Sequence, residues 1–280
     1  MDWSRAVALV TGASSGIGYE TALAFAARGA RVVGVARRED RLRELIAECN
    51  RQAPRASFLA GDLGDPDFAQ RAVGETVSRH GRIDVLVNNA GMPKHKQIYD
   101  LSPSEAEQVL RVNFLSAVWT TLAAIQPMLA QGGGVIVNVS SFAALVVPPR
   151  ESIYAASKAA LNAWSAGLWN DLAGSGVHVA LVNPGAIATE IWEKLDQPPA
   201  FAGRKHPPQI VVDAILECVE KRRHECTVPR HSVSLFGARL LRALTPGLLR
   251  RAMTRFDPVP AEVLAQAQAS AGAAERSRRD

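Results

Sequence analysis

The sequence contains few cysteines and few aromatic residues. Only three of its 280 residues are cysteine, and aromatic residues make up 6% of the chain. Cys49, Cys218 and Cys226 are too few and too scattered for a zinc site or a disulfide framework. We therefore expect no metal site and a reducing, cytoplasmic environment. Cys218 lies in an apolar helical pattern, where a small buried side chain is the usual state.

Long hydrophobic runs are also missing. No apolar run approaches the roughly 20 residues that a membrane span needs. Residues 1–5 lead straight into the first predicted strand, so we expect no signal peptide. The hydrophobic fraction of 48% is ample for one buried core. The sequence thus predicts a single α/β domain with an appendage.

Positive charge is concentrated near the C-terminus. The formal net charge is +5, and residues 204–280 hold 14 Lys/Arg against 8 Asp/Glu, a local excess of six. A basic surface suits acidic lipids or nucleic acid. No nucleic-acid-binding motif is present, so we do not expect a DNA or RNA partner.

Short apolar runs alternate with helical stretches over the first 230 residues. This alternation is typical of a parallel sheet with helices on both faces. It predicts a doubly wound sheet of about seven strands over residues 1–229, followed by an extension over 230–280. The predicted strands are 7–10, 31–36, 57–60, 83–87, 135–139, 177–182 and 225–228, and the predicted longer helices are 40–51, 66–80, 103–130 and 154–173.

A glycine-rich turn follows the first predicted strand. Residues 11–18 read TGASSGIG and precede an apolar-periodic helix. Gly12 permits a tight bend, Gly16 lets the backbone approach a pyrophosphate, and Gly18 lets the helix pack on the strand. The helix N-terminus would offer free N–H groups to the anion. This arrangement is typical of the first part of a dinucleotide-binding Rossmann unit. A glycine-rich loop without a ligand is the alternative.

A second pattern indicates proton transfer. Tyr154 and Lys158 are one helical turn apart, Ser141 precedes the tyrosine by thirteen residues, and Asn113 lies further upstream. A phenol has an ordinary pKa of about 10, and an ammonium beside it favours the phenolate. Ser141 would hold a substrate oxygen, and Asn113 would complete a proton relay to solvent. An isolated Tyr-x-x-x-Lys pair is usually only a feature of a helix surface.

Together these motifs resemble the short-chain dehydrogenase/reductase family. The resemblance covers about residues 4–190, in the order and spacing of that family, and includes Asn88-Asn89-Ala90-Gly91 and Pro184-Gly185. It implies a general acid/base at Tyr154 and an oxygen-positioning role for Ser141. It also implies that Lys158 lowers the tyrosine pKa and holds the nicotinamide ribose, and that Asn113 supports a water-linked proton path. The neighbouring Ser140 is the less suitable serine.

The resemblance also implies a set of coenzyme contacts. Asp62 would accept from the adenine amino group, the backbone of Leu63 would cap the ring, and residues 89–91 would line the adenosine ribose. For Asn88 a structural role in the sheet is the better interpretation. The predicted coenzyme residues are Gly12, Ser14, Ser15, Gly16, Ile17, Gly18, Arg37, Arg38, Asp62, Leu63, Asn89, Ala90, Gly91, Tyr154, Lys158, Pro184, Gly185, Ile187 and Thr189.

The end of the second strand predicts the type of coenzyme. An acidic residue there would accept both ribose hydroxyls and repel a 2′-phosphate. This chain has Ala36, followed by Arg37 and Arg38, whose guanidinium groups suit a phosphate. We therefore predict NADP(H) rather than NAD(H), with Arg37 as the better candidate for the direct contact. Ordinary surface arginines are the alternative.

The substrate would lie beneath residues 189–208. This segment is rich in proline and carries apolar residues, including Trp192, so it predicts a lid over a lipophilic alcohol or ketone. Phe142, next to Ser141, would line the same pocket together with Tyr154. His95 would either meet a polar substrate group or lie exposed in its loop without a role.

The C-terminal extension predicts two amphipathic helices. Residues 232–244 place apolar residues at helical spacing with arginines on the flank, and Thr245-Pro246 is typical of the start of a second helix, running to about Phe256. Three interpretations stay open: packing on the same or a neighbouring subunit, closing the substrate pocket, or contact with an anionic membrane. We expect residues 275–280 to be loosely ordered.

The sequence therefore predicts an NADP(H)-dependent oxidoreductase. It would interconvert a secondary alcohol with a ketone or aldehyde, with Tyr154 as the general acid/base. The alternative is a non-catalytic dinucleotide-binding sensor or scaffold with the same fold. The resemblance and the apolar helix 154–173 favour a homodimer or homotetramer.

Overall fold

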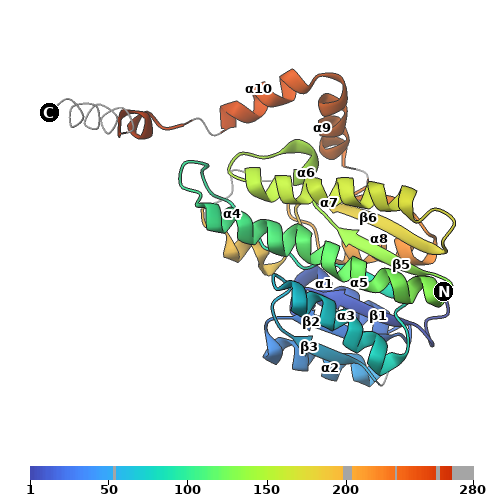
Figure 1. Cartoon of the computed structure of the whole chain (residues 1–280). Helices are drawn as coiled ribbons and strands as arrows, with labels where there is room; N and C mark the ends of the chain where they lie inside the picture. Colours follow the sequence, from blue (N-terminus) through green and yellow to red (C-terminus); the bar gives the residue numbers. More distant parts are fainter. Residues whose placement is uncertain (53–54, 198–203, 231, 257–258, 267–280) are drawn as a thin grey trace.

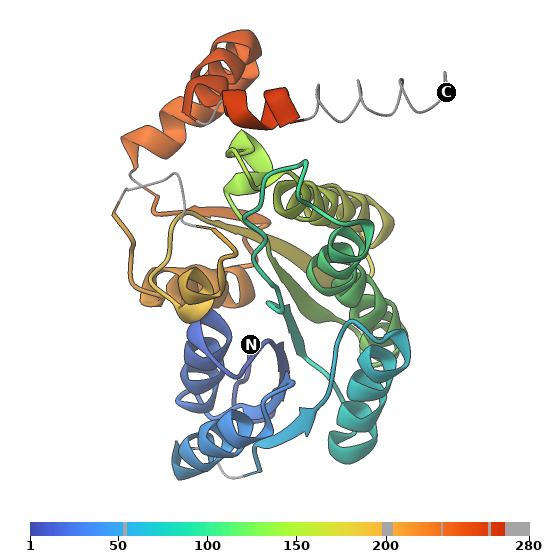
Figure 2. The ribbon, with the colours of Figure 1, turned by 90° about the vertical axis from the view of Figure 1, so that its left-hand side faces the viewer.

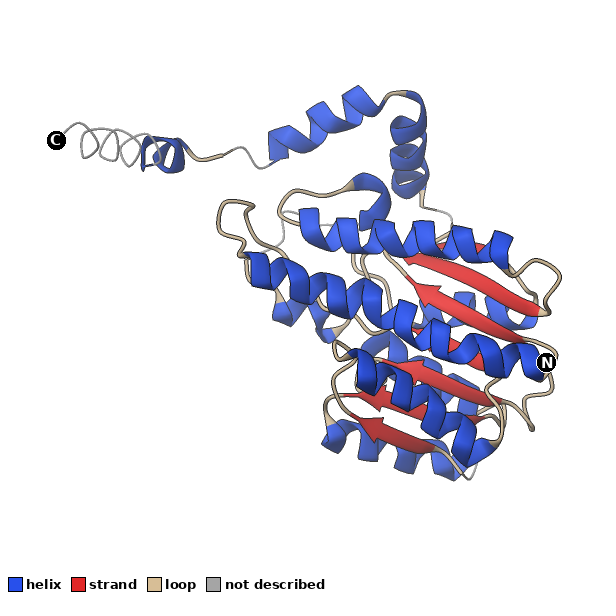
Figure 3. Cartoon of the chain, viewed as in Figure 1, coloured by secondary structure: helices blue, strands red, loops and turns tan. Residues whose placement is uncertain are grey.

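A computed structural model describes residues 1–52, 55–197, 204–230, 232–256 and 259–266. Its centre is a seven-stranded parallel sheet (Figure 3). The strands are β1 (Val7–Thr11), β2 (Arg31–Ala36), β3 (Ser57–Ala60), β4 (Val85–Asn88), β5 (Gly134–Val139), β6 (Val177–Pro184) and β7 (Glu225–Val228). The five inner strands are almost fully buried and rich in Val, Ile and Ala, as expected when helices cover both faces of a sheet, and the edge strands β3 and β7 are more exposed.

The strand order is β3-β2-β1-β4-β5-β6-β7. The chain moves outward from β1 to β3 and then returns to place β4 on the other side of β1. This reversal opens a crevice at the carboxyl ends of β1 and β4, where Rossmann-type sheets bind their ligands. The predicted doubly wound α/β fold is confirmed.

Two helical layers cover the sheet, as Figures 1 and 2 show. One core cluster joins α1, α2 and α8 to one face of the sheet, and a second joins α3, α5 and α7 to the other. The helices of the two layers are α1 (Gly16–Ala26), α2 (Glu39–Gln52), α3 (Pro66–His80), α5 (Ser116–Ala130), α7 (Ser152–Asp171) and α8 (Gln209–Glu220).

The predicted helix 103–130 contains a local change of winding. It consists of α4 (Pro103–Leu110), a π-helical turn η1 (Arg111–Leu115) and α5. Over an 18-residue window its mean hydropathy is 1.3, enough by length and composition to cross a membrane. It instead packs on the sheet, where Ala124 and Met128 are buried in the core. The expectation that no segment is long and apolar enough for a membrane span is therefore wrong for this helix, whose apolar residues instead contribute to the core.

Helix α7 also packs within its own subunit. Leu161 and Leu168 are buried, and Trp169 donates a hydrogen bond from Nε1 to the Val179 carbonyl at 2.9 Å. Trp164 packs against the same core. These residues therefore fill the chain's own core, and the prediction of a homo-oligomer rests on the resemblance.

The extension forms two helices beyond the sheet, α9 (Val233–Leu244) and α10 (Pro246–Phe256). In Figure 1 they lie above α6 (Ala143–Val146) and α7, and α10 projects away from the sheet. The hydroxyl of Ser232 caps α9 by accepting from the Leu235 N–H at 3.3 Å. The predicted loose end at 275–280 lies outside the described residues, and the division at residue 229 stays a prediction.

Candidate active site

Tyr154 is half-buried beside Ser141 at the carboxyl end of the sheet. Ser141 follows β5, and Tyr154 lies in the first turn of α7. Burial raises the pKa of Tyr154 to about 12; a hydrogen bond with Ser141 works in the opposite direction, and the Glu151 carboxylate adds to the rise. The tyrosine hydroxyl is therefore protonated at neutral pH in the ligand-free chain.

Lys158 lies one turn further along α7 and is 4% exposed. Its Nζ donates to the Val139 carbonyl at 3.0 Å, and the Ser140 hydroxyl donates to the Lys158 carbonyl at 3.1 Å. Burial lowers the pKa of Lys158 to about 8. The pKa of Tyr154 is raised by burial and by Glu151, and the prediction that Lys158 lowers it stays a prediction.

Asn113 lies within the π-turn and is 1% exposed. Its side chain accepts from the Met92 N–H at 2.7 Å and donates to the Met92 carbonyl and the Ser157 hydroxyl at 3.0 and 3.1 Å. These bonds tie the loop after β4 to α7. The Asn113 amide thus holds the site together, and the predicted proton relay from it to solvent stays a prediction. Sequence reasoning missed Ser157, whose only signal is a hydroxyl on a buried helix face next to Lys158.

The glycine turn has the conformation that its sequence predicts. Gly12 and Gly16 have φ values of +65° and +55°, which favour glycine. A Cβ at Gly18 would stand 2.4 Å from the Gly12 carbonyl oxygen, so only glycine allows α1 to pack so closely. Ser15, at the N-cap of α1, makes no side-chain capping bond. The first turn of α1 therefore keeps its N–H groups for another acceptor.

The turn after β4 is hydrogen-bonded to the glycine turn. The Thr11 hydroxyl accepts from the N–H groups of Asn89 and Ala90 at 2.9 and 3.0 Å, and Asn89 Nδ2 donates to the Thr11 carbonyl at 3.1 Å. Asn88 bonds to side chains in its own layer, including Asn138 at 2.9 Å, as a structural role requires. A Cβ at Gly91 would lie 3.5 Å from Lys158 Nζ. The Asn-Asn-Ala-Gly segment therefore joins the coenzyme turn to the catalytic residues.

The two arginines after β2 have different surroundings. Arg37 is exposed. Arg38 donates from Nε and Nη2 to the Ser14 hydroxyl at 3.3 and 3.2 Å, and from Nη1 to Glu190 at 3.0 Å. Arg38 therefore lies against the glycine turn. The geometry favours Arg38 over Arg37 for a coenzyme phosphate, in contrast to the sequence prediction.

The remaining predicted coenzyme residues lie at the same edge of the sheet. Asp62 is exposed after β3 and accepts from the Gly64 N–H at 2.9 Å. The Gly185 N–H donates to the Val228 carbonyl at 2.7 Å. Thr189 packs over the glycine turn, because a Cβ at Gly16 would lie 3.0 Å from its Cγ2. The predicted coenzyme residues therefore come from both halves of the sheet and lie at the same edge of it.

Of the predicted substrate residues, Phe142 is buried next to Ser141 in the chain, and Trp192 is half-buried. Phe142 is 6% exposed. Trp192, in the short helix η2 (Glu190–Lys194), donates from Nε1 to the Ile187 carbonyl at 2.6 Å, and Lys205 lies 4.3 Å from its ring centre. The part of the predicted lid at 198–203 lies outside the described residues.

His95 is buried, so the expectation that it lies exposed is wrong. It is 1% exposed, and its Nδ1 lies 3.4 Å from a Glu151 carboxylate oxygen. The next residue, Lys96, donates its backbone N–H to the Arg150 carbonyl at 2.8 Å, which holds the loop against the start of α7. A role for His95 toward a polar substrate group stays a prediction.

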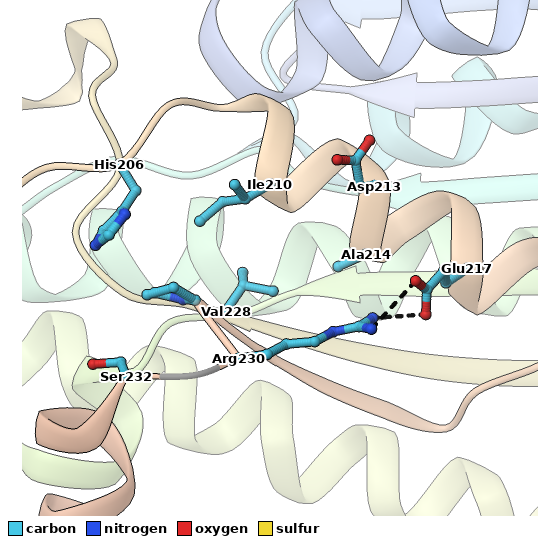
Figure 4. A pocket seen from close by; sticks show the side chains of 9 residues that line it. His206, Ile210, Asp213, Ala214, Glu217, Val228, Arg230 and Ser232 are labelled. Carbon is cyan, nitrogen blue, oxygen red and sulfur yellow. Dashed lines mark hydrogen bonds and ion pairs between the residues drawn. The ribbon is translucent and has the colours of Figure 1, made fainter.

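A surface pocket of about 550 Å³ lies between α8, the end of β7 and His206 of the loop that follows β6 (Figure 4). Arg230 and Glu217 face each other across it in a two-point ion pair, with N–O distances of 3.2 and 2.7 Å. None of the four catalytic candidates lines this pocket. This pocket is therefore separate from the group formed by Asn113, Ser141, Tyr154 and Lys158.

Comparison with known proteins agrees with this geometry. A family model described as short chain dehydrogenase matches residues 6–200. The chain is 43% identical over 192 residues to 11-beta-hydroxysteroid dehydrogenase 1A of Arabidopsis thaliana, covering 67% of this chain and 54% of the relative. It thus spans about half the length of that relative. It is 35% identical over 219 residues to cyclopentanol dehydrogenase of Comamonas testosteroni, covering 75% of this chain and 88% of that protein.

Solved structures show the same fold with coenzyme bound. A short-chain dehydrogenase from Sphingobium yanoikuyae in complex with NADPH has a TM-score of 0.75 and 31% identity, covering 88% of this chain and 95% of that one. A short chain dehydrogenase from Burkholderia cenocepacia in complex with NADP has a TM-score of 0.74 and 30% identity, covering 81% and 98%. This chain belongs to the short-chain dehydrogenase family.

Proposed function

We propose that this protein is an NADP(H)-dependent oxidoreductase that interconverts a secondary alcohol with a ketone or aldehyde. The observation that carries the proposal is the group formed by the half-buried Ser141 and Tyr154 and the buried Lys158 at the carboxyl end of the sheet. The glycine turn, with Gly12 and Gly16 at positive φ, fits a dinucleotide at the same edge. A bound nicotinamide would supply the hydride chemistry.

The protein residues would bind the substrate oxygen and transfer its proton. Ser141 would hold the oxygen, and the Tyr154 hydroxyl would donate a proton to it during reduction or accept one during oxidation. Because burial raises the pKa of Tyr154 to about 12, the hydroxyl is ready to donate at neutral pH. The Lys158 ammonium would hold the coenzyme ribose, and Asn113 would fix the loop at Met92.

Two observations support NADP(H) as the coenzyme. Ala36 stands where an acidic residue would accept the ribose hydroxyls of NAD(H). Arg38 lies against Ser14 of the glycine turn and so places a guanidinium beside the adenosine end of the crevice. A guanidinium there suits a 2′-phosphate.

The apolar surroundings support a lipophilic substrate. Phe142 borders Ser141, and Trp192 follows the loop that carries Thr189. Related proteins are named for a hydroxysteroid and for cyclopentanol, both cyclic secondary alcohols. We propose a substrate of this chemical class, a cyclic or otherwise lipophilic secondary alcohol and its ketone.

The central test replaces the tyrosine hydroxyl. Tyr154→Phe removes the proton donor without changing the ring, so kcat for NADPH-dependent ketone reduction should fall about 10²-fold or more. Tyr99→Phe, at a loop residue that is 42% exposed, is the matched control and should retain full activity. NADPH binding, followed by fluorescence titration, should persist in both variants. Substantial turnover by Tyr154→Phe would contradict the assigned role.

The alternative function, a non-catalytic dinucleotide sensor, makes a different prediction. A sensor would bind NADPH but reduce none of a panel of ketones, aldehydes and quinones. The buried Lys158 side chain favours catalysis, because burying an amine is costly without a chemical role. We also propose a cytoplasmic homodimer or homotetramer, to be checked by sedimentation.

The C-terminal helices support a proposal about a surface partner. Helices α9 and α10 together contain five arginines and no acidic residue, and Phe236 and Leu244 are 69% and 71% exposed. Pairing with a second copy through this surface would bring like charges together. An anionic membrane surface fits both the apolar and the cationic side chains.

A further inference from the structure

Residues 190–196, which follow Thr189, are attached to the rest of the domain by an ion pair near each end. At its start, Glu190 accepts from Arg38 at 3.0 Å. Near its other end, Asp196 accepts from Lys94 at 3.1 Å, and Lys94 also pairs with Glu105 at 2.8 Å. The first pair faces the coenzyme side of the crevice, and the second faces the loop that follows β4.

The two attachments differ in exposure. The side chains of Arg38 and Glu190 are 36% and 37% exposed, whereas the Lys94 side chain is 7% exposed. Exposed ion pairs contribute little to stability and are easily exchanged for another partner. The Lys94 pairs are more shielded from water. The coenzyme end of the segment is therefore the end that an anionic ligand can release.

Each of the three guanidinium nitrogens of Arg38 has an acceptor within the chain. Its Nε and Nη2 donate to Ser14, with Nη2 reaching both the hydroxyl and the carbonyl, at 3.2 and 3.3 Å. Its Nη1 donates to Glu190. A phosphate that binds Arg38 through two nitrogens must therefore displace at least one of these oxygens.

Glu190 is the acceptor that can leave. The Ser14 oxygens belong to the glycine turn and stay beside Arg38. Glu190 has a second cation nearby, because Lys194 Nζ lies 3.7 Å from the same carboxylate oxygen. A carboxylate displaced from Arg38 would therefore keep an ion pair within η2. Its negative charge would otherwise stand close to an incoming phosphate.

We propose that Glu190 is a coenzyme-specificity residue that competes with the 2′-phosphate for Arg38. Binding of a 2′-phosphorylated coenzyme exchanges the Arg38–Glu190 pair for an Arg38–phosphate pair and frees the start of the segment that carries Trp192. A coenzyme without that phosphate leaves the pair in place. This inference rests on the proposed NADP(H) function and assigns Glu190 a positioning role through Arg38.

The proposal predicts opposite effects of the two residues of the pair. Arg38 favours the phosphorylated coenzyme, and Glu190 limits that preference because its pair must first be broken. The coupling is reciprocal, so displacing Glu190 and binding the phosphate strengthen each other. Since an exposed pair is worth at most about 1 kcal/mol, the gain on removing Glu190 should be roughly two- to fivefold.

The experiment uses nucleotide fragments that differ only in the phosphate. Binding of 2′,5′-ADP and 5′-AMP to the full chain is measured by calorimetry. Glu190→Gln should bind 2′,5′-ADP roughly two- to fivefold more tightly than the wild type and leave 5′-AMP unchanged. Glu193→Gln, an exposed glutamate on the same short helix, is the matched control and should change neither. The gain in Glu190→Gln should shrink at high salt.

A second measurement follows the segment itself. Addition of 2′,5′-ADP should change the fluorescence of Trp192, with Trp192→Phe as the reference for the other tryptophans, and 5′-AMP should not. In Glu190→Gln this phosphate-dependent change should be lost, because no pair remains to be broken. A role confined to local stability would not produce this difference.

The outcomes separate this inference from the proposed function. If the wild type prefers 2′,5′-ADP and Glu190→Gln matches it, or Glu193→Gln shows the same gain, the inference is overturned and the coenzyme proposal stands. If the wild type binds the two nucleotides equally, the NADP(H) preference fails and the inference fails with it.

Discussion

The catalytic centre and the edge that would take the coenzyme phosphate are built in opposite ways. Asn113 and Lys158 are 1% and 4% exposed, and hydrogen bonds to three different segments fix them. Arg38 and Glu190 are more than a third exposed and form a single ion pair. In the interior, hydrogen bonds hold the side chains in fixed positions. At the edge, the exposed ion pair between Arg38 and Glu190 is one that a ligand can replace.

Solvent exposure explains the difference in electrostatics. In the interior, loss of water raises the pKa of Tyr154 to about 12 and lowers that of Lys158 to about 8. At the edge, Arg38 beside Glu190 lowers the pKa of that carboxyl. Interior substitutions should therefore change rates by orders of magnitude, and edge substitutions should change coenzyme choice by smaller factors.

The pH profile is the strongest test of the interior after Tyr154→Phe. In ketone reduction, kcat/KM requires a protonated Tyr154 and, in our proposal, a charged Lys158. Because the pKa of Lys158 is about 8, kcat/KM should be level below pH 8 and fall by about tenfold or more by pH 9.5. In alcohol oxidation the Tyr154 phenolate is needed as well as the charged Lys158, so its increase with pH should offset the loss of the lysine charge and the activity should stay nearly level over that range.

The free energy of unfolding should increase with pH over the same range in which kcat/KM falls. The folded-state pKa of Lys158 lies below the ordinary 10.5, so the unfolded chain binds more protons between pH 8 and 10.5. The contribution of Lys158 to the free energy of unfolding therefore increases as pH rises through that window. A level kcat/KM through pH 9.5 would contradict the role of a charged Lys158, and thermal unfolding at each pH would exclude denaturation as the cause of a fall.

Arg38→Ala is the sharpest test of the edge. Loss of a charge-assisted contact should weaken NADPH binding by roughly tenfold or more and leave NADH within about twofold. Arg37→Ala removes the same charge from the neighbouring exposed position and should have a smaller effect. A larger loss in Arg37→Ala would restore the sequence prediction and show that Arg38 serves only to hold Glu190.

The extension should have the smallest effect on turnover. Reversing Arg250 and Arg251 to glutamate should leave reduction of a soluble ketone within about twofold, since both side chains are exposed on α10. The same change should lower co-sedimentation with anionic vesicles by roughly thirtyfold or more, because each basic residue near such a surface contributes about 1 kcal/mol and two are lost. Truncation after Pro229 should abolish the co-sedimentation. Equal binding to neutral and anionic vesicles would contradict an electrostatic contact.

Short-range patterns in the sequence predicted the elements well. The parallel strands were predictable because fully buried strands are continuous apolar runs, and Gly12, Gly16 and Gly18 specified the turn because each glycine meets a local steric requirement. The spacing of Ser141, Tyr154 and Lys158 likewise identified a catalytic group whose members the fold brings together at one edge of the sheet.

Contacts between distant segments were not predictable. His95 is buried against Glu151, and Lys94 pairs with Asp196 across 102 residues of sequence. The choice of Arg38 over Arg37 depends on which of two adjacent side chains turns toward Ser14. No periodicity encodes such pairings, because they arise only when separate loops meet at the strand ends.

The sequence by itself determined the alternation of strands and helices and the glycine turn, and its motif spacing supplied the proposed proton-transfer residues, because each of these follows from local sterics or from spacing along the chain. The tertiary structure alone decided how deeply Tyr154 and Lys158 are buried, and hence the direction of their pKa shifts. It also decided that Glu190 meets Arg38. Desolvation and long-range ion pairs depend on what surrounds a group in space, and neighbours in the chain do not specify those surroundings.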